Sequence, residues 1–121
     1  MEKMTINGRV YIPEDEAKEM TMATNTDGLE YCIIRTYSAG VHVGYVAERN
    51  GKEVKLLNAR RLWKWAGAFT LSEIAVKGVS KPNECKFSCH VPEIWLTEAI
   101  EVIPCTDSAR INIEAVKAYD C

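Results

Sequence analysis

The chain of 121 residues has no long apolar run. No stretch approaches the roughly 20 apolar residues that a membrane-spanning helix needs, and the polar N-terminus lacks the apolar centre typical of a signal peptide. The net charge is only −2, so the strongly basic surface of a non-specific nucleic-acid binder is also missing. We therefore expect a soluble protein that associates with neither membranes nor duplex nucleic acid.

Catalytic and metal-binding motifs are also missing. The sequence contains no P-loop, nucleophile elbow or dinucleotide-fold fingerprint, although either histidine could serve a cysteine nucleophile. Cys85, Cys89 and His90 fit a structural zinc site poorly, because such sites show closer cysteine pairs and a fourth ligand at a regular distance. Thiols are reduced by default in a chain without an export signal, and Cys32 and Cys105 are expected to be small buried apolar residues. We expect no metal, no cofactor and no enzymatic activity.

The strand signals are concentrated in the middle of the chain. Alternating side chains predict strands over Tyr31 to Tyr37 and over Val41 to Tyr45. Asn50-Gly51 is a strong hairpin signal, because both residues tolerate positive φ. A third strand is expected from Glu53 to Leu57, and extended character continues over Arg60 to Trp65.

Two helices are predicted in the second half. Thr70 to Glu73 forms a capping box, which opens a short helix that ends at Gly78. A cap at Thr106 to Ser108 opens the last helix, expected over Ala109 to Tyr119. Further strands are predicted between the helices: Lys86 to Val91, Ile94 to Thr97 and Ala99 to Ile103. The predicted fold class is α+β, with a mainly antiparallel β-sheet, a short central helix and a C-terminal helix. We expect residues 1–30 to form an N-terminal arm and residues 31–121 a single nucleotide-binding domain.

Two segments carry residue types that hold phosphates and bases. The first is R-T-Y-S-A-G-V at residues 35–41, and the second is N-A-R-R-L-W-K-W at residues 58–65. Guanidinium groups bind phosphate oxygens in pairs, indoles stack on purines, and a glycine allows a ligand to approach the backbone closely. Arg35, Ser38, Ala39 and Gly40 are therefore candidate contacts, although Gly40 could serve only the turn.

The paired arginines and tryptophans each have a plainer structural interpretation. In a strand, Arg60 and Arg61 lie on opposite faces, so one could pair with a carboxylate such as Glu53 or Glu101 and leave the other for a ligand. Trp63 and Trp65 would share one face, and tryptophans of a small domain are most often core or interface anchors.

The start of the last helix is a second candidate site. Its first turn presents amides and the positive end of the helix dipole, which suit a pyrophosphate. Thr106 and Ser108 surround that turn, Arg110 could clamp a phosphate or stack on adenine, and Asp107 could accept from a ribose hydroxyl. The alternative is an ordinary helix cap with a surface arginine.

The order R-T-Y-S-A-G-V, hairpin, N-A-R-R-L-W-x-W and T-L-S-E-I-A-x-x-G resembles a family of small bacteriophage proteins. The resemblance runs from about Tyr31 to Ile103. Members of that family counter the Thoeris defence system by sequestering its cyclic ADP-ribose signal.

The resemblance implies a nucleotide sponge that binds glyco-cyclic ADP-ribose, and possibly the cyclic oligonucleotides of CBASS, without cleaving them. It implies a cytoplasmic location in the infected bacterial host and a dimer that assembles further into a hexamer. The family's cyclic ADP-ribose site precedes the C-terminal helix and implies an aromatic residue and an arginine around the base. We assign the aromatic to Phe87, since loops often carry binding groups, and the arginine to Arg110. The resemblance also implies a second site, which binds cyclic oligonucleotides at a symmetry axis and includes Gly40 and Arg60.

Two other functions remain open from the sequence. The tryptophans and arginines could make the subunit contacts of a phage structural or protein-interaction module. A slow hydrolase of cyclic nucleotides is the third possibility.

Overall fold

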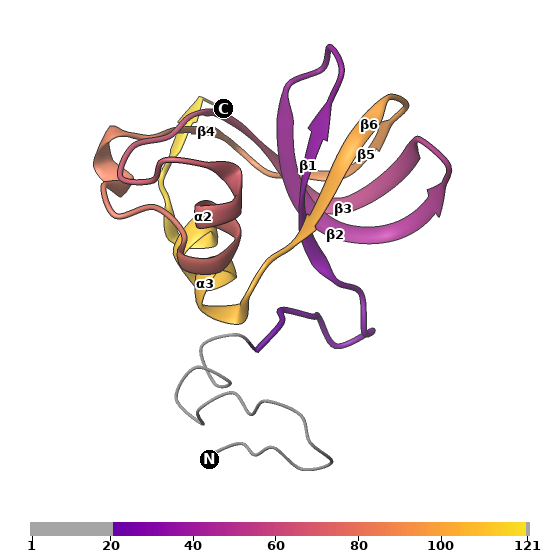
Figure 1. Cartoon of the computed structure of the whole chain (residues 1–121), viewed down its shortest axis with the longest axis horizontal. Helices are drawn as coiled ribbons and strands as arrows, with labels where there is room; N and C mark the ends of the chain where they lie inside the picture. The colour runs from indigo at the N-terminus through magenta and orange to yellow at the C-terminus, as the bar shows by residue number, and fades with distance from the viewer. Residues whose placement is uncertain (1–20, 121) are drawn as a thin grey trace, which may run out of the picture.

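The computed structural model describes residues 21–120, in which seven strands form a mostly antiparallel sheet accompanied by two α-helices (Figure 1). This confirms the predicted α+β class. The strands are β1 (Tyr31–Thr36), β2 (Val41–Asn50), β3 (Glu53–Lys64), β4 (Lys86–Ser88), β5 (Val91–Leu96), β6 (Ala99–Pro104) and β7 (Ala118–Asp120). The helices are α2 (Leu71–Lys77), α3 (Asp107–Ala115) and the short 3-10 helix η2 (Pro82–Glu84).

Most of the predicted N-terminal arm lies outside the described residues. Its described part, residues 21–30, is attached to the domain by backbone hydrogen bonds. The amide of Ala23 donates to the carbonyl of Cys105 at 3.0 Å, and the amide of Asp107 donates to the carbonyl of Thr21 at 2.7 Å. Ala23 is buried, so this part of the chain packs on the domain.

The sheet curls so that a short turn between Leu96 and Ala99 joins β5, which pairs with β3, to β6, which pairs with β1. The strand order is β6-β1-β2-β3, with β5 pairing with the first part of β3 and β4 with its last residues. Figure 1 shows the curled strands on one side of the molecule and α2, α3 and β4 on the other. β3 is therefore the element that joins the two halves.

β3 contains a bulge that reverses which side chains face inward. Val43 is opposite Arg60 and Tyr45 is opposite Leu57, so Gly44 alone faces both Asn58 and Ala59. Asn58 adopts a positive φ of 51°, as an extra residue in a bulged strand can require. A Cβ at Gly44 would lie 3.0 Å from the Cβ of Ala59, so only glycine fits without displacement.

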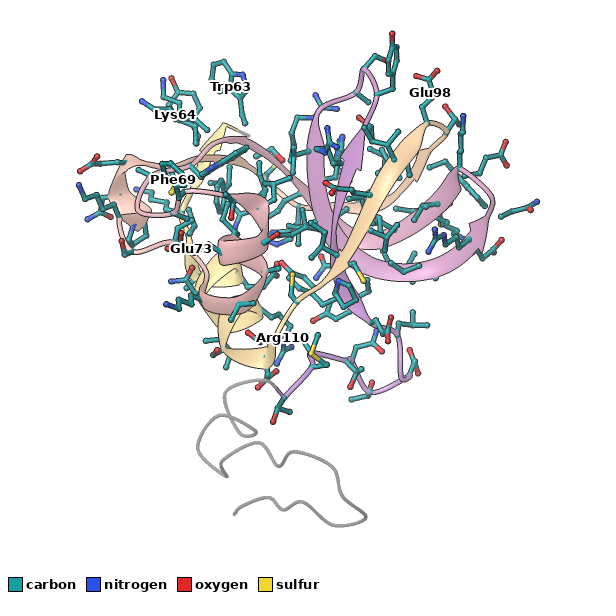
Figure 2. The ribbon with its side chains drawn as sticks, viewed as in Figure 1. Trp63, Lys64, Phe69, Glu73, Glu98 and Arg110 are labelled. Atoms are coloured by element: carbon teal, nitrogen blue, oxygen red, sulfur yellow. The ribbon has the colours of Figure 1, made fainter. Side chains whose placement is uncertain are left out.

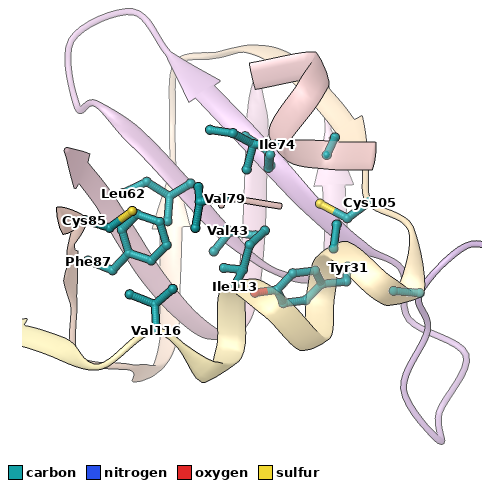
Figure 3. Close-up of a cluster of buried hydrophobic side chains, with 14 of the residues drawn as sticks. Tyr31, Val43, Leu62, Ile74, Val79, Cys85, Phe87, Cys105, Ile113 and Val116 are labelled. Carbon is teal, nitrogen blue, oxygen red and sulfur yellow. The ribbon is translucent and has the colours of Figure 1, made fainter. Parts of the chain in front are cut away.

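Two hydrophobic clusters hold the fold together. The smaller lies inside the curled sheet and includes Cys32, Ile34 and Leu56. The larger lies between the sheet and the helices and includes Tyr31 and Ile113 (Figure 3). Because alternate residues of β1 enter different clusters, that strand is buried on both faces.

Three of the cysteines contribute to this burial. Cys32, Cys85 and Cys105 are buried free thiols, which confirms the expectation that Cys32 and Cys105 are buried. Cys89 is disulfide-bonded, so the expectation of reduced thiols is wrong at that position. Burial raises the pKa of Cys32 and of Cys105 to about 12. Both side chains are therefore neutral at physiological pH.

Both helices begin at the predicted caps. The hydroxyl of Thr70 accepts from the amide of Glu73, and the Glu73 carboxylate accepts from the amide of Phe69. The hydroxyl of Thr106 accepts from the amide of Ala109 at the start of α3. α2 is capped at its end by Gly78, which has a φ of 78°, as expected for a helix stop.

Several sequence-based boundaries are wrong. The segment Lys86 to Val91 is not a single strand, because β4 ends at Ser88 and β5 begins at Val91. The last helix ends at Ala115 rather than Tyr119, because residues Ala118–Asp120 pair with β4 in parallel instead. Trp63 and Trp65 do not share an environment, because β3 ends at Lys64. Trp63 is exposed, whereas Trp65 packs against the larger hydrophobic cluster.

Candidate functional site

A cleft of about 620 Å³ opens where β3 exchanges one neighbouring strand for another. Ala59 of β3 pairs with Val91 of β5, whereas Leu62 pairs with Phe87 of β4, so β4 and β5 diverge over this part of β3. A volume of 620 Å³ lies within the range usual for small-molecule sites. The lining residues are His42, Ala59, Arg60, Arg61, Trp63, Lys86, Phe87, Ser88, Cys89, Val91, Ile94 and Tyr119.

The charged groups among the described residues of the cleft all have one sign. Arg60, Arg61 and Lys86 are cations, and none of the described lining residues is an aspartate or glutamate. Arg61 and Lys86 take part in none of the ion pairs found among the described residues. Because neither side chain is paired with a carboxylate of the described residues, their charges can attract an anion.

Exposed aromatic rings form the outer wall of the cleft. Trp63 is 66% exposed and Tyr119 is 57% exposed, and their ring centroids lie 5.9 Å apart. Figure 2 shows Trp63 pointing away from the ribbon beside the C-terminal strand. An indole left this exposed contributes little to the core, but it offers a face on which a planar group can stack.

Arg60 is the buried cation of the cleft, with only 2% of its surface exposed. Its Nε donates to the carbonyl of Ser88, and its Nη1 donates to the carbonyls of Ile113 and Val116 at 3.0 and 2.9 Å. The guanidinium also lies over the ring of Phe87. Burial lowers the pKa of Arg60, and the carbonyls at the end of α3 compensate part of the cost of burying the charge.

Ser88 and His42 complete the inner wall. The Ser88 hydroxyl accepts from the amide of Arg61 at 2.7 Å, so Ser88 is bonded to both arginines. His42 is cross-strand partner to Arg61, and its Nε2 lies 2.9 Å from the carbonyl oxygen of Ala39. Burial lowers the pKa of His42, which favours the neutral ring at physiological pH.

Residues 29–113 match a family model described as a domain of unknown function, DUF6948. The chain belongs to this family. Comparison with the curated proteins and comparison with the solved structures both give no significant match. Among the cleft residues of this DUF6948 chain, Tyr119 lies outside the matched region.

No described helix of the DUF6948 chain is long and apolar enough to cross a membrane. Within residues 21–120, His, Cys, Asp and Glu side chains form no cluster of three that could hold a metal ion. The groups that the cleft brings together are suited to binding an anionic aromatic molecule.

The predicted contacts around the turn between β1 and β2 lie outside the cleft, and two of them bond to other parts of the domain. Arg35 forms an ion pair with Glu101 at 2.8 Å, and the Ser38 hydroxyl donates to the carboxylate of Glu98. Ala39 and Gly40 are exposed, and Gly40 has a φ of 88°. Within this chain Gly40 therefore serves the turn between β1 and β2.

The predicted contacts at the start of α3 also bond within the domain. Arg110 donates to the hydroxyl of Tyr45 at 3.1 Å and to the carboxylate of Asp107 at 2.6 Å. These two bonds raise the pKa of Arg110. The Arg110 Nε atom is buried without a partner among the described residues. Thr106 is buried and bonded to the carbonyl of Val76, and Ser108 is exposed.

Arg110 and Trp63 lie at opposite ends of the view in Figure 2. The structure therefore does not bring the α3 candidates together with the cleft. Phe87 does lie in the cleft wall, but it belongs to β4 and is fully buried beneath Arg60. The expectation that Phe87 lies in a loop is therefore wrong. Because the ring is buried, a base cannot stack on Phe87 unless the residues around it move.

Among the cleft residues that the sequence did not identify as candidates are His42 as a wall residue, Lys86 and Tyr119. Lys86 and Tyr119 become neighbours because β4 and β7 pair in parallel. A three-residue strand carries too little periodicity to be recognised, and Tyr119 was assigned to the helix. The alternation of Arg60 and Arg61 was a readable signal, since it predicted opposite faces for the two arginines, with one structural and the other left for a ligand.

Proposed function

We propose that this protein binds a phosphorylated nucleotide signal in the cleft and sequesters it without cleaving it. The observation that supports this proposal is the composition of the cleft. Arg61 and Lys86 supply accessible positive charge, Trp63 and Tyr119 supply stacking surface, and none of the described lining residues carries a carboxylate. The two cations can bind the phosphates of a nucleotide, and the two aromatic rings can stack on its bases.

The proposed ligand is a cyclic nucleotide of the bacterial immune response, with glyco-cyclic ADP-ribose first and the cyclic oligonucleotides of CBASS second. This choice follows the resemblance to phage Thoeris anti-defence proteins. We propose the same setting: the cytoplasm of an infected bacterium, with the protein acting as a dimer that assembles to a hexamer. Sequestration acts by mass action, because a tightly binding protein in excess lowers the free signal concentration.

The direct test uses the signal made by an activated Thoeris synthase. Purified protein is mixed with the signal and removed by filtration, and the flow-through is assayed on the Thoeris effector. The retained fraction is then heated and assayed in the same way. Sequestration predicts an inactive flow-through and full recovery of active signal after heating.

Each of the other outcomes points elsewhere. An active flow-through would exclude this signal as the ligand. A loss of signal that heating does not restore would indicate cleavage, and the protein would be a hydrolase.

A protein-interaction module is the second candidate function. It is favoured by the exposure of large apolar side chains, among them Phe69 at 93% and Trp63 at 66%, because aromatic residues are enriched at protein interfaces. Arg61→Ala distinguishes the two functions. It should weaken retention of the signal in a nucleotide sponge and leave the oligomeric state unchanged.

A further inference from the structure

The ammonium group of Lys86 covers the stacking surface of the cleft. Its Nζ lies over the ring of Trp63, 5.2 Å from the centroid, and over the ring of Tyr119, 4.7 Å from the centroid. The two rings are already in contact with each other, so a third ring does not fit between them. A planar ligand that stacks on the faces beneath Lys86 must displace the ammonium.

This arrangement affects uncharged and phosphorylated ligands differently. An uncharged ring that displaces Lys86 removes two cation–π contacts and forms no ion pair with the ammonium in their place. A nucleotide removes the same contacts, but its phosphate offers the displaced ammonium an ion pair. Lys86 has no carboxylate partner among the described residues that would compete for it.

We infer that Lys86 makes the cleft selective for phosphorylated nucleotides over uncharged aromatic compounds. The inference rests on the proposed function, since it concerns the same cleft. It assigns Lys86 a double role. In the unliganded protein Lys86 disfavours uncharged rings, and in the complex it binds the anionic group.

The experiment measures the affinities of adenosine and of cyclic ADP-ribose for the wild-type protein and for Lys86→Ala by calorimetry or ligand-observed NMR. In Lys86→Ala we expect adenosine to bind about 3-fold more tightly, because the two ring faces are uncovered. We expect cyclic ADP-ribose to bind about 10-fold more weakly, because the phosphate loses a charged partner. The two changes have opposite signs, which a general loss of structure cannot produce.

Lys64 provides a matched control. It is exposed, it is the cross-strand partner of Lys86, and it does not line the cleft. Lys64→Ala removes the same charge from the neighbouring strand and should change neither affinity by more than about 2-fold. Lys86→Arg keeps a cation over the rings and should preserve the wild-type preference.

The outcomes separate the inference from the proposed function. If the wild-type protein binds cyclic ADP-ribose and Lys86→Ala shifts both ligands in the same direction, or leaves adenosine unchanged, the role of Lys86 is overturned and the cleft remains a nucleotide site. If the wild-type protein binds neither ligand, the role of Lys86 is overturned, and the filtration assay with the Thoeris signal decides the proposed function separately.

Discussion

The Nη1 atom of Arg60 donates to the carbonyl oxygen of Ile113 at 3.0 Å, which joins the second half of β3 to the last turn of α3. The same nitrogen donates to Val116. A positive charge at this position is favourable, because the carbonyls at a helix C-terminus carry partial negative charge. Arg60 is therefore a structural link, and Arg61, on the opposite face, is left for the cleft.

Arg60→Ala should lower the free energy of unfolding by about 3 kcal/mol, because three carbonyls lose a charged donor in a buried site. Arg61→Ala, the matched control, should cost less than about 0.5 kcal/mol, because its side chain is exposed. Urea denaturation of both variants is the measurement. Equal costs would show that Arg60 does not hold α3 to the sheet.

The strands around this link could largely be predicted from the sequence. Alternation over Tyr31 to Tyr37 and the Asn50-Gly51 signal report local chemistry, and both give elements near their observed positions. The caps at Thr70 and Thr106 are equally local. The bulge at Asn58 was not foreseen, because nothing in its neighbours requires an extra residue in the strand.

The cleft could not be assembled from the sequence because its walls come from separate segments. Lys86 and Tyr119 meet only through the parallel pairing of β4 with β7, and His42 meets Arg61 only through the register of β2 with β3. The groups around Arg110 were singled out by the chemistry of a helix start. In the structure, Arg110 already donates hydrogen bonds to Tyr45 and Asp107 within the domain.

Gly44→Ala tests the bulge that determines which of the two arginines faces inward. The new Cβ would lie 3.0 Å from the Cβ of Ala59 and 3.1 Å from the carbonyl oxygen of Leu57. The expected cost is about 1 to 3 kcal/mol of unfolding free energy, as for other overpacked sites.

Ala59→Gly in the Gly44→Ala background should recover part of that cost, because it removes one of the close contacts. The four proteins form a double-mutant cycle measured by denaturation. Additive costs would show that the approach of Gly44 to Ala59 does not limit the bulge.

The buried thiols predict a loss of stability at alkaline pH. Burial raises the pKa of Cys32 and of Cys105 from 9.0 to about 12, so the folded protein keeps their protons where the unfolded chain releases them. The stabilisation is fully present below pH 9 and is lost progressively as the pH rises from 9 toward 12. Thermal melts between pH 8 and pH 11 should show Tm falling above pH 9.

The comparison variant for this titration is Cys32→Ala with Cys105→Ala. Its Tm will be lower at pH 8 because of the lost packing, but it should fall less steeply above pH 9. Parallel slopes for the two proteins would assign the alkaline loss to other groups.

Three arginine variants decide where the ligand binds. Arg61→Ala removes a charge from the cleft wall without a known structural bond of its side chain. It should weaken binding of the retained signal by about 10-fold or more, because a charge-assisted hydrogen bond to phosphate contributes about 1.5 to 3 kcal/mol. Arg35→Ala and Arg110→Ala remove cations already bonded to Glu101 and Asp107, and each should change binding by less than about 3-fold.

The measurement is retention of signal on a filter at increasing protein concentration, with circular dichroism to verify folding. Loss of retention in Arg110→Ala alone would move the site to the start of α3. Loss in Arg35→Ala alone would move it to the turn before β2, and in either case the cleft would require another ligand.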